Sequence, residues 1–286
     1  MEAGREKGVL LESPARPDKP QRNSVLLTLD LTRAVVDEAI RRRDSLIVAY
    51  HPIIFRGLKE ITLGNSQQES LLRLAQEGIS VYSPHTAVDA VTGGLGDWMV
   101  DIVTSPFRGR PGFTFEASVL SPSIVTLQGF EGAGIGRAVK FSQEVNLADL
   151  LEAIGRRLGM EYLQLALPSH LQAQPHDTIP LSSIAMCAGS GWPIIRSLPV
   201  NVLFTGELSH HDALAAIEAG KIVIATWHSN SERGFLSEVM GPRLREVVEE
   251  RWRAEVGGKE AEWGGEVEVG ISKVDRDPYQ VVRVGR

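Results

Sequence analysis

A histidine and a glutamate follow the most strand-like segment of the sequence. Residues 222–225 read IVIA, a short apolar run typical of a buried β-strand, and they lead into His228 and then Glu232. A helix that begins near Ser229 would direct both side chains beyond the carboxyl end of the strand, where open α/β sheets bind ligands. An imidazole and a carboxylate at that place favour a divalent metal ion over simple packing.

The same arrangement occurs earlier in the chain. Residues 79–82 read ISVY, again strand-like, and are followed by His85 and, four residues later, Asp89. Each strand comes after a segment predicted to be a helix, which ends at Gly78 in one case and at Gly220 in the other.

A further strand that leads to histidine precedes each of these helices. The first ends at His51 and the second runs on to His210 and His211. The order strand–His, helix–Gly, strand–HxxxD/E therefore appears twice, and we interpret it as an internal duplication of a β-α-β unit. Two such units facing each other would bring their histidine–carboxylate ends together.

The candidate ligands carry imidazole and carboxylate groups but no thiolate. A single histidine at a strand end is more often a hydrogen-bonded structural residue, but five in matched positions favour a metal site. Without a CxxC pair, the prediction is one or two catalytic or exchangeable ions such as Zn²⁺, Fe²⁺ or Mn²⁺, which would activate a water molecule. The candidates are His51, His85, Asp89, His210, His211, His228 and Glu232, with Glu207 nearby.

Three of these residues have alternative interpretations. Ser209 can cap a helix, in which case His210 and His211 face the site without binding a metal. Glu207 can orient a ligand histidine or act as a general base. We therefore predict Glu207 and His210 as the catalytic residues. Neither a GxSxG motif nor an exposed cysteine supports a covalent nucleophile.

Composition excludes several other classes of protein. The chain has 286 residues, 43% of them hydrophobic, and a net charge of −6, which argues against direct nucleic-acid binding. The single cysteine, Cys187, lies in an apolar run and indicates a reducing compartment. No apolar segment is long enough to cross a membrane, and the first residues do not resemble a signal peptide. We expect a cytoplasmic protein, with the nucleus or mitochondrion as alternatives.

Three glycine-rich segments raise the question of anion binding. Residues 92–97 (TGGLGD) match no standard phosphate loop, and we expect Asp97 to cap the following helix. The GFEGAGIG segment at 129–136 does not have the spacing of a dinucleotide site. Gly189-Ser190-Gly191 is either a tight strand-to-helix turn or a backbone anion site, and the turn is favoured.

The predicted fold is α/β, with two intertwined domains that each contain a mixed sheet flanked by helices. We expect a loose segment over residues 1–23 and a first α/β unit over 24–120. A middle segment over 121–182 would complete the second sheet, and a second unit over 183–286 would end in a helix and a strand. Helices are expected over 66–77 and from 147, where Asn146 is the cap.

Six motifs in a fixed order resemble the Nif-three-like proteins, which are also described as homologues of a type-two GTP cyclohydrolase I. The motifs are AYHPIIF, SPHTAVDAVTGGLGDW, GFEGAGIGR, CAGSG, TGELSHHDALAA and HSNSERGFL. The resemblance runs from about Val25 to at least Met240. It implies a duplicated α/β fold, a dinuclear metal site and a ring-like homo-oligomer, commonly a hexamer.

Carried over by position, the ligands of this family fall on His51, Asp89, His228 and Glu232. A further ligand of the family falls on Tyr50, as in its eukaryotic-type branch, and a phenol is a poor ligand unless it is ionised. The site would then hold one ion or two unequal ions. The chain also lacks the Trp-Asp-Asn-x-Gly segment that family members usually carry before the first Leu-Leu pair, where only Gly8-Val9-Leu10-Leu11 stands here.

Two functions follow from this resemblance. The first is a metal-dependent hydrolase-like enzyme that acts on a small nucleotide-like substrate, with GTP cyclohydrolase-type chemistry by analogy. The second is a non-enzymatic protein that binds or delivers metal, or a regulatory scaffold that binds a transcription factor.

Overall fold

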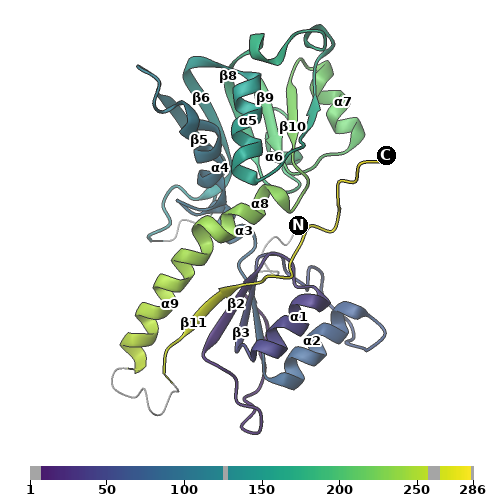
Figure 1. Cartoon of the computed structure of the whole chain (residues 1–286), viewed down its shortest axis with the longest axis vertical. Helices are drawn as coiled ribbons and strands as arrows, with labels where there is room; N and C mark the ends of the chain where they lie inside the picture. The colour runs from purple at the N-terminus through teal and green to yellow at the C-terminus, as the bar shows by residue number, and fades with distance from the viewer. Residues whose placement is uncertain (1–7, 125–127, 257–264, 285–286) are drawn as a thin grey trace. The chain divides into compact units, whose positions relative to one another are not determined.

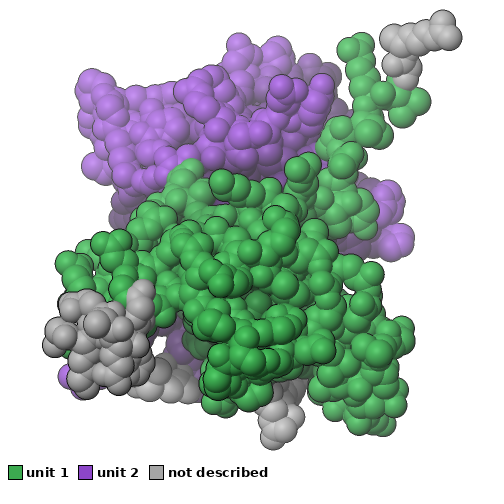
Figure 2. Space-filling view, turned by 60° about the horizontal axis from the view of Figure 1, so that its bottom comes forward, with its two compact units in different colours: residues 1–87, 236–286 green, residues 88–235 purple. Residues whose placement is uncertain are grey.

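The computed structural model describes residues 8–124, 128–256 and 265–284. The chain forms two compact units, coloured separately in Figure 2. Unit 1 consists of residues 1–87 and 236–286, and unit 2 of residues 88–235. Because unit 1 is built from both ends of the chain, the two units are interleaved along the sequence. The sequence-based boundaries at 23, 120 and 182 stay a prediction.

Unit 1 contains a five-stranded mixed sheet. Its strand order is β1-β4-β3-β2-β11, in which β1 is antiparallel to β4 and all other pairs are parallel. Residues of β2 and β3 are almost all buried, as expected for strands covered on both faces. The strands are β1 (Gly8–Leu11), β4 (Ser80–Ser83), β3 (Leu46–Ala49), β2 (Ser24–Thr28) and β11 (Glu268–Ile271).

The helices of unit 1 begin and end at recognisable caps. Helix α1 (Arg33–Arg42) begins after Thr32, whose side chain accepts a hydrogen bond from the Val35 N–H. Helix α2 (Ser66–Glu77) begins after Asn65 and ends at Gly78, whose φ of 78° suits glycine. The helix predicted over 66–77 is therefore confirmed. Figure 1 shows α1 and α2 beside β2 and β3, with α9 (Gly241–Val256) packed against β11.

Unit 2 contains a six-stranded mixed sheet with the order β5-β6-β8-β9-β10-β7. Strands β8, β9 and β10 are parallel, and the flanking pairs are antiparallel. The strands are β5 (Phe115–Pro122), β6 (Gly134–Asn146), β8 (Pro180–Cys187), β9 (Val202–Thr205), β10 (Ile222–Ala225) and β7 (Gln164–Ala166).

Helices flank the second sheet as well. Helix α5 begins after Asn146, whose side chain accepts from the Asp149 N–H, and this confirms the predicted cap. Helices α4 (Leu95–Thr104) and α5 (Leu147–Leu158) pack on β6, α6 (Trp192–Ile195) packs on β8, and α7 (His210–Glu218) packs on β10. The remaining helices of the described residues are α3 (Thr86–Ala90), η1 (Ser105–Phe107), η2 (Ser169–Leu171), η3 (His176–Thr178), α8 (Asn230–Phe235) and the π-helical turn η4 (Leu236–Met240).

The two sheets repeat one topology, which confirms the mixed α/β fold. Four strands occur in the order β1-β4-β3-β2 in one sheet and β7-β10-β9-β8 in the other. In both, an antiparallel strand lies beside three parallel strands. The carboxyl ends of β3 and β4, and those of β9 and β10, therefore occupy equivalent positions.

Within the described ranges, no helix is both long and apolar enough to cross a membrane.

Two local expectations are corrected. Residues 8–11 lie in the segment expected to be loose, but they form β1, which adds an antiparallel strand to β4. Asp97 is not the cap of its helix, because α4 begins after Gly94. The Asp97 carboxylate instead accepts hydrogen bonds from the Gly93 N–H at 2.6 Å and from Nε of Arg137 at 2.7 Å.

The Arg137 guanidinium is buried, with only 3% of the residue exposed, and it joins β6 to α4. Its Nη1 also donates to the carbonyls of Gly134 and Gly136, at 2.6 and 3.0 Å. Arg137→Ala is expected to reduce the free energy of unfolding by roughly 3 kcal/mol, because it leaves buried acceptors without donors. Urea unfolding measures this change. Arg156→Ala is the control, since its exposed pair with Glu152 contributes less than about 0.5 kcal/mol.

Candidate metal site

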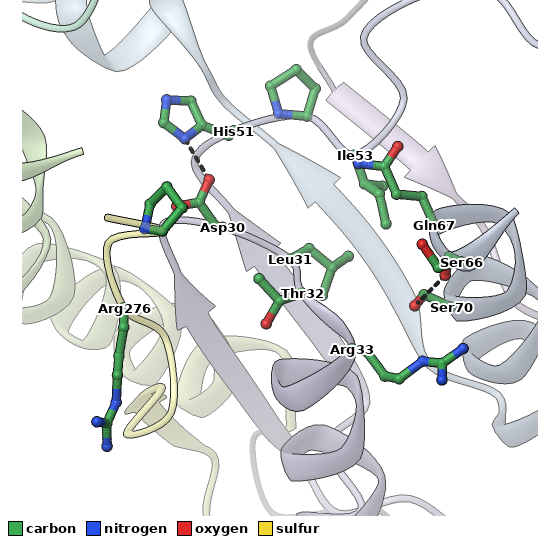
Figure 3. Close-up of a pocket in the computed structure, with 12 residues that line it drawn as sticks. Asp30, Leu31, Thr32, Arg33, His51, Ile53, Ser66, Gln67, Ser70 and Arg276 are labelled. Atoms are coloured by element: carbon green, nitrogen blue, oxygen red, sulfur yellow. Dashed lines mark hydrogen bonds and ion pairs between the residues drawn. The ribbon is translucent and has the colours of Figure 1, made fainter. Parts of the chain in front are cut away.

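The first group of predicted ligands lies in unit 1, around His51. This residue follows β3, and its backbone N–H donates to the Leu29 carbonyl at 2.9 Å. Its Nδ1 lies 2.9 Å from Oδ1 of Asp30, as Figure 3 shows. A carboxylate at Nδ1 selects the tautomer in which this nitrogen carries the proton, so Nε2 presents a lone pair. Asp30 was not among the predicted site residues.

The rings of Tyr50 and His85 lie beside His51. Tyr50 is 2% exposed, and its ring centroid lies 4.9 Å from that of His51. The His85 ring lies 6.1 Å from both. His85 has a φ of 41°, an unusual value for a residue with a side chain, and such strain is often retained at functional sites. The structure thus brings His51 and His85 together beside Tyr50.

A pocket of about 460 Å³ opens beside His51 in the same unit. Figure 3 shows Asp30, His51 and Thr32 along its wall, with the start of α2 opposite. The wall is completed by Arg276 and Pro278, which come from the end of the chain. Both sequence segments that make up unit 1 therefore line the pocket.

The second group lies in unit 2, after β10. His228 follows Trp227, whose φ of 62° turns the chain sharply at the end of the strand. Helix α8 then begins at Asn230 and places Glu232 one turn beyond His228. Nε2 of His228 lies 3.6 Å from Oε1 of Glu232, which is 3% exposed. The predicted His–x₃–Glu pair is therefore brought together.

Glu207 fixes the orientation of His228. Its Oε1 lies 2.8 Å from Nδ1 of His228 and accepts a hydrogen bond from Ser190 at 2.7 Å. Partial burial opposes ionisation of Glu207, but the bonds from His228 and Ser190 outweigh it and lower its pKa. With the proton of the neutral imidazole on Nδ1, the lone pair of Nε2 faces the Glu232 carboxylate. Two acceptors facing each other require a cation or an additional proton.

Gly189 keeps the space in front of this pair open. Its φ is 58°, and a Cβ on it would lie 2.8 Å from Oε1 of Glu232 and 3.0 Å from Nε2 of His228. Its N–H donates to the Ser231 hydroxyl at 2.9 Å, and its carbonyl accepts from the Glu207 N–H at 2.9 Å. Only glycine fits here without displacing one of these two atoms.

The structure favours a tight turn over a backbone anion site at Gly189-Ser190-Gly191. Both glycine N–H groups of the turn are used internally, since the Gly191 N–H donates to the Thr205 hydroxyl at 3.1 Å. Helix α6, which follows, has only four residues. The favoured interpretation as a tight turn therefore agrees with the structure, while the contact of Gly189 with the histidine–glutamate pair was not predicted.

Asp89 and Glu232 belong to the same region of unit 2. Both carboxylates raise the pKa of Cys187, although burial is the larger cause of its rise to about 12. Asp89 and Glu232 therefore both lie close enough to the Cys187 thiol to act on it electrostatically. The sequence-based expectation that Asp89 and Glu232 occupy one region is consistent with this effect.

Cys187 is expected to be unreactive in the folded protein, because its thiol stays protonated far above neutral pH. Its folded-state pKa is raised from 9.0, so stability is unaffected below about pH 9 and falls as pH rises toward 12. In this range the free energy of unfolding falls by at most about 1.4 kcal/mol per pH unit. Thiol labelling at pH 8 and unfolding between pH 8 and 11 test this, and the slope should be smaller in Cys187→Ala.

His210 was predicted as a catalytic residue. It does not take part in the contacts of His228 with Glu207 and Glu232. It is the first residue of α7, after the cap Ser209, whose hydroxyl accepts from the Asp212 N–H at 3.2 Å. His210 and His211 are exposed and their rings lie 5.4 Å apart. The alternative in which Ser209 caps a helix is therefore the one that the structure shows.

The donor set of unit 2 fits a divalent cation. His228 and Glu232 belong to a group that could hold a metal ion, and one is oriented by a second carboxylate, as in many metal sites. His51 belongs to unit 1, whereas Asp89, His228 and Glu232 belong to unit 2. That all four share one ion stays a prediction.

Comparison with known proteins gives one consistent family. The sequence model of Duf34/NIF3 (NGG1p interacting factor 3) matches residues 7–261. The protein NIF3 homolog of Schizosaccharomyces pombe is 39% identical over 272 residues, which are 95% of this chain and 88% of that protein. The NGG1-interacting factor 3 of Saccharomyces cerevisiae is 36% identical over 92% of this chain and 83% of its own.

Solved structures show the same fold at low sequence identity. A hypothetical protein of Staphylococcus aureus has a TM-score of 0.68 at 19% identity, covering 96% of this chain and 91% of its own. A Bacillus cereus protein related to NIF3 has a TM-score of 0.67 at 18% identity, covering 98% and 94%. These similarities extend over both units.

Proposed function

The chain belongs to the Duf34/NIF3 family, and on this premise we propose that it is a divalent-metal-binding protein. The observation that carries the proposal is the opposition of Nε2 of His228 and Oε1 of Glu232 across a space that only a glycine leaves open. The proposed ligands are His51, Asp89, His228 and Glu232. Buried Tyr50 beside His51 favours one ion, or two of unequal affinity, over an equivalent pair.

The groups around the proposed ligands have separate tasks. Asp30 and Glu207 hold the Nδ1 protons of His51 and His228, which leaves Nε2 of each ring available as a ligand. A bound divalent ion would supply Lewis acidity and lower the pKa of water. The lowered pKa of Glu207 keeps its exposed carboxylate ionised, so in this proposal it would accept a proton near the site only as a weak base. The same role for His210 rests on the sequence alone.

The favoured activity is hydrolysis of a small nucleotide-like substrate, with GTP cyclohydrolase-type chemistry by family resemblance. An oriented histidine, a buried glutamate and an exposed carboxylate in one place support metal-assisted hydrolysis. The second candidate is a non-enzymatic metal-binding or regulatory protein with a transcription-factor partner. Its support is the name of the budding yeast relative, an NGG1-interacting factor.

Assembly and location complete the proposal. By resemblance, the chain forms a homo-oligomer, commonly a hexameric ring, and sedimentation analysis measures its size. A cytoplasmic location, with the nucleus or mitochondrion as alternatives, is supported by the free, buried Cys187.

The enzyme and the regulatory protein separate in one experiment. The purified protein is analysed for bound metals and assayed for release of phosphate or formate from a panel of nucleotides, with and without chelator. Turnover that disappears with chelator and in His228→Ala supports the hydrolase. Bound metal without turnover on the panel supports the second candidate, and a protein that binds no divalent metal contradicts both metal-based functions.

A further inference from the structure

The last described segment of the chain is built into the first sheet. Strand β11 pairs in parallel with β2, so that Glu268 lies opposite Ser24 and Ile271 opposite Leu27. The family match ends at residue 261, before this strand begins. Residues after 266 therefore contribute an edge strand to the unit that contains His51.

A buried glutamate anchors the turn after β11. Glu38 of α1 is 6% exposed, and its Oε2 accepts a hydrogen bond from the Ser272 hydroxyl at 2.6 Å. Its Oε1 accepts from the Lys273 N–H at 3.2 Å. The Ser272 N–H donates to the Leu27 carbonyl at 2.8 Å. These bonds fix where the chain goes as it leaves the sheet.

Beyond the carboxyl end of β2, the Asp275 carboxylate accepts backbone hydrogen bonds as a neighbouring strand would. Its Oδ2 accepts hydrogen bonds from the N–H groups of Leu29, at 2.7 Å, and Asp30, at 3.4 Å. The Leu29 carbonyl accepts from the His51 N–H at 2.9 Å. Leu29 is thus held between Asp275 on one side and His51 on the other.

The same contact sets the position of the carboxylate that orients His51. Asp30 follows Leu29 directly, and its Oδ1 lies 2.9 Å from Nδ1 of His51. In Figure 3 the C-terminal segment, in yellow, passes beside Asp30 and carries Arg276. Movement of the Leu29–Asp30 backbone would therefore rotate or withdraw the group that selects the His51 tautomer.

We propose that Asp275 is a positioning residue for His51: it holds the Leu29–Asp30 backbone so that Asp30 directs Nε2 of His51 as a metal ligand. This inference rests on the proposed role of His51 as a ligand. It makes the C-terminal segment part of the metal site, although that segment supplies no ligand itself.

The test measures the affinity of the purified protein for Zn²⁺ and Co²⁺ by competition with a chromophoric chelator. Asp275→Ala is expected to weaken binding about tenfold, the lower end of the effect of removing an outer-shell partner. Asp275→Asn keeps an acceptor oxygen of the same reach and should bind within about twofold of the wild type. If the alanine variant does not fold, Asp275→Ser replaces it, since its shorter side chain does not reach Leu29.

The control is Asp277→Ala, which removes a carboxylate two residues further along the same segment, one that accepts from the Tyr279 N–H at 2.7 Å. Affinities are compared at a temperature where every metal-free variant is folded, so that loss of stability alone does not change them. The Co²⁺ absorption spectrum should shift in Asp275→Ala and not in Asp275→Asn.

Two results distinguish the inference from its premise. Unchanged affinity in Asp275→Ala, while His51→Ala loses the metal, overturns the positioning role and leaves the ligand assignment intact. Wild-type affinity in His51→Ala shows instead that His51 is not a ligand, so the proposed metal site itself fails.

Discussion

Glu232→Gln is expected to weaken the binding of a divalent ion by more than about 100-fold, beyond the effect of losing an outer-shell partner. Glu232 is the buried carboxylate that faces Nε2 of His228, and an amide oxygen supplies neither its charge nor its basicity. The change preserves shape, and the metal-free variant should be no less stable because a buried charge has been removed. Competition with a chelator measures affinity, and thermal unfolding without metal measures stability.

The matched control is Glu218→Gln, an exposed glutamate at the end of α7 in the same unit. It carries the same change in net charge and should bind metal as the wild type does. Equal affinities for the Glu232 and Glu218 variants would show that the carboxylate facing His228 is not a ligand.

Gly189→Ala is expected to abolish metal binding by a different physical route. The new methyl group would lie 2.8 Å from Oε1 of Glu232 and 3.0 Å from Nε2 of His228, and would fill the space that the proposed ion needs. The φ of 58° adds a backbone cost of about 1 kcal/mol, and the overlap adds about 1–3 kcal/mol. Metal content after dialysis and urea unfolding measure the two effects.

Gly159→Ala separates strain from obstruction. Gly159 ends α5 with a φ of 66°, and a Cβ there meets nothing within 4 Å. It should lose about 1 kcal/mol of stability and bind metal normally. If Gly189→Ala binds metal as well as Gly159→Ala does, the space beside Gly189 is not a cation site.

Local signals predicted much of the fold. Asn65 and Gly78 mark the ends of α2, and Asn146 marks the start of α5, because caps act over three or four residues. Matched strand–histidine patterns predicted the repeated topology of the two sheets. Strand β1 was missed because the segment around it is polar and rich in proline, and it is stabilised by pairing with β4, about 70 residues away.

The contact between His228 and Glu232 was predictable because the two residues are close in sequence. The spacing of His228 and Glu232 predicted that both lie on one helical turn. Glu207 was expected to orient a ligand histidine or to act as a general base, and its Oε1 lies 2.8 Å from Nδ1 of His228. The place of His210 was left open because a helix start and a strand end look alike in the segment SHHD, and the structure places it at the start of α7. The roles of Gly189 and Asp275 could not be found, since Gly189 lies 39 positions from His228 and Asp275 lies 246 positions from Leu29.

The most direct test is anomalous diffraction from crystals of the protein loaded with Zn²⁺, recorded on both sides of the zinc absorption edge. The account predicts an anomalous peak within bonding distance of Nε2 of His228 and Oε1 of Glu232, in the space beside Gly189, with no sulfur ligand. A peak confined to surface histidines such as His210 and His211, or no peak beside Gly189 in crystals that diffract well, would contradict it.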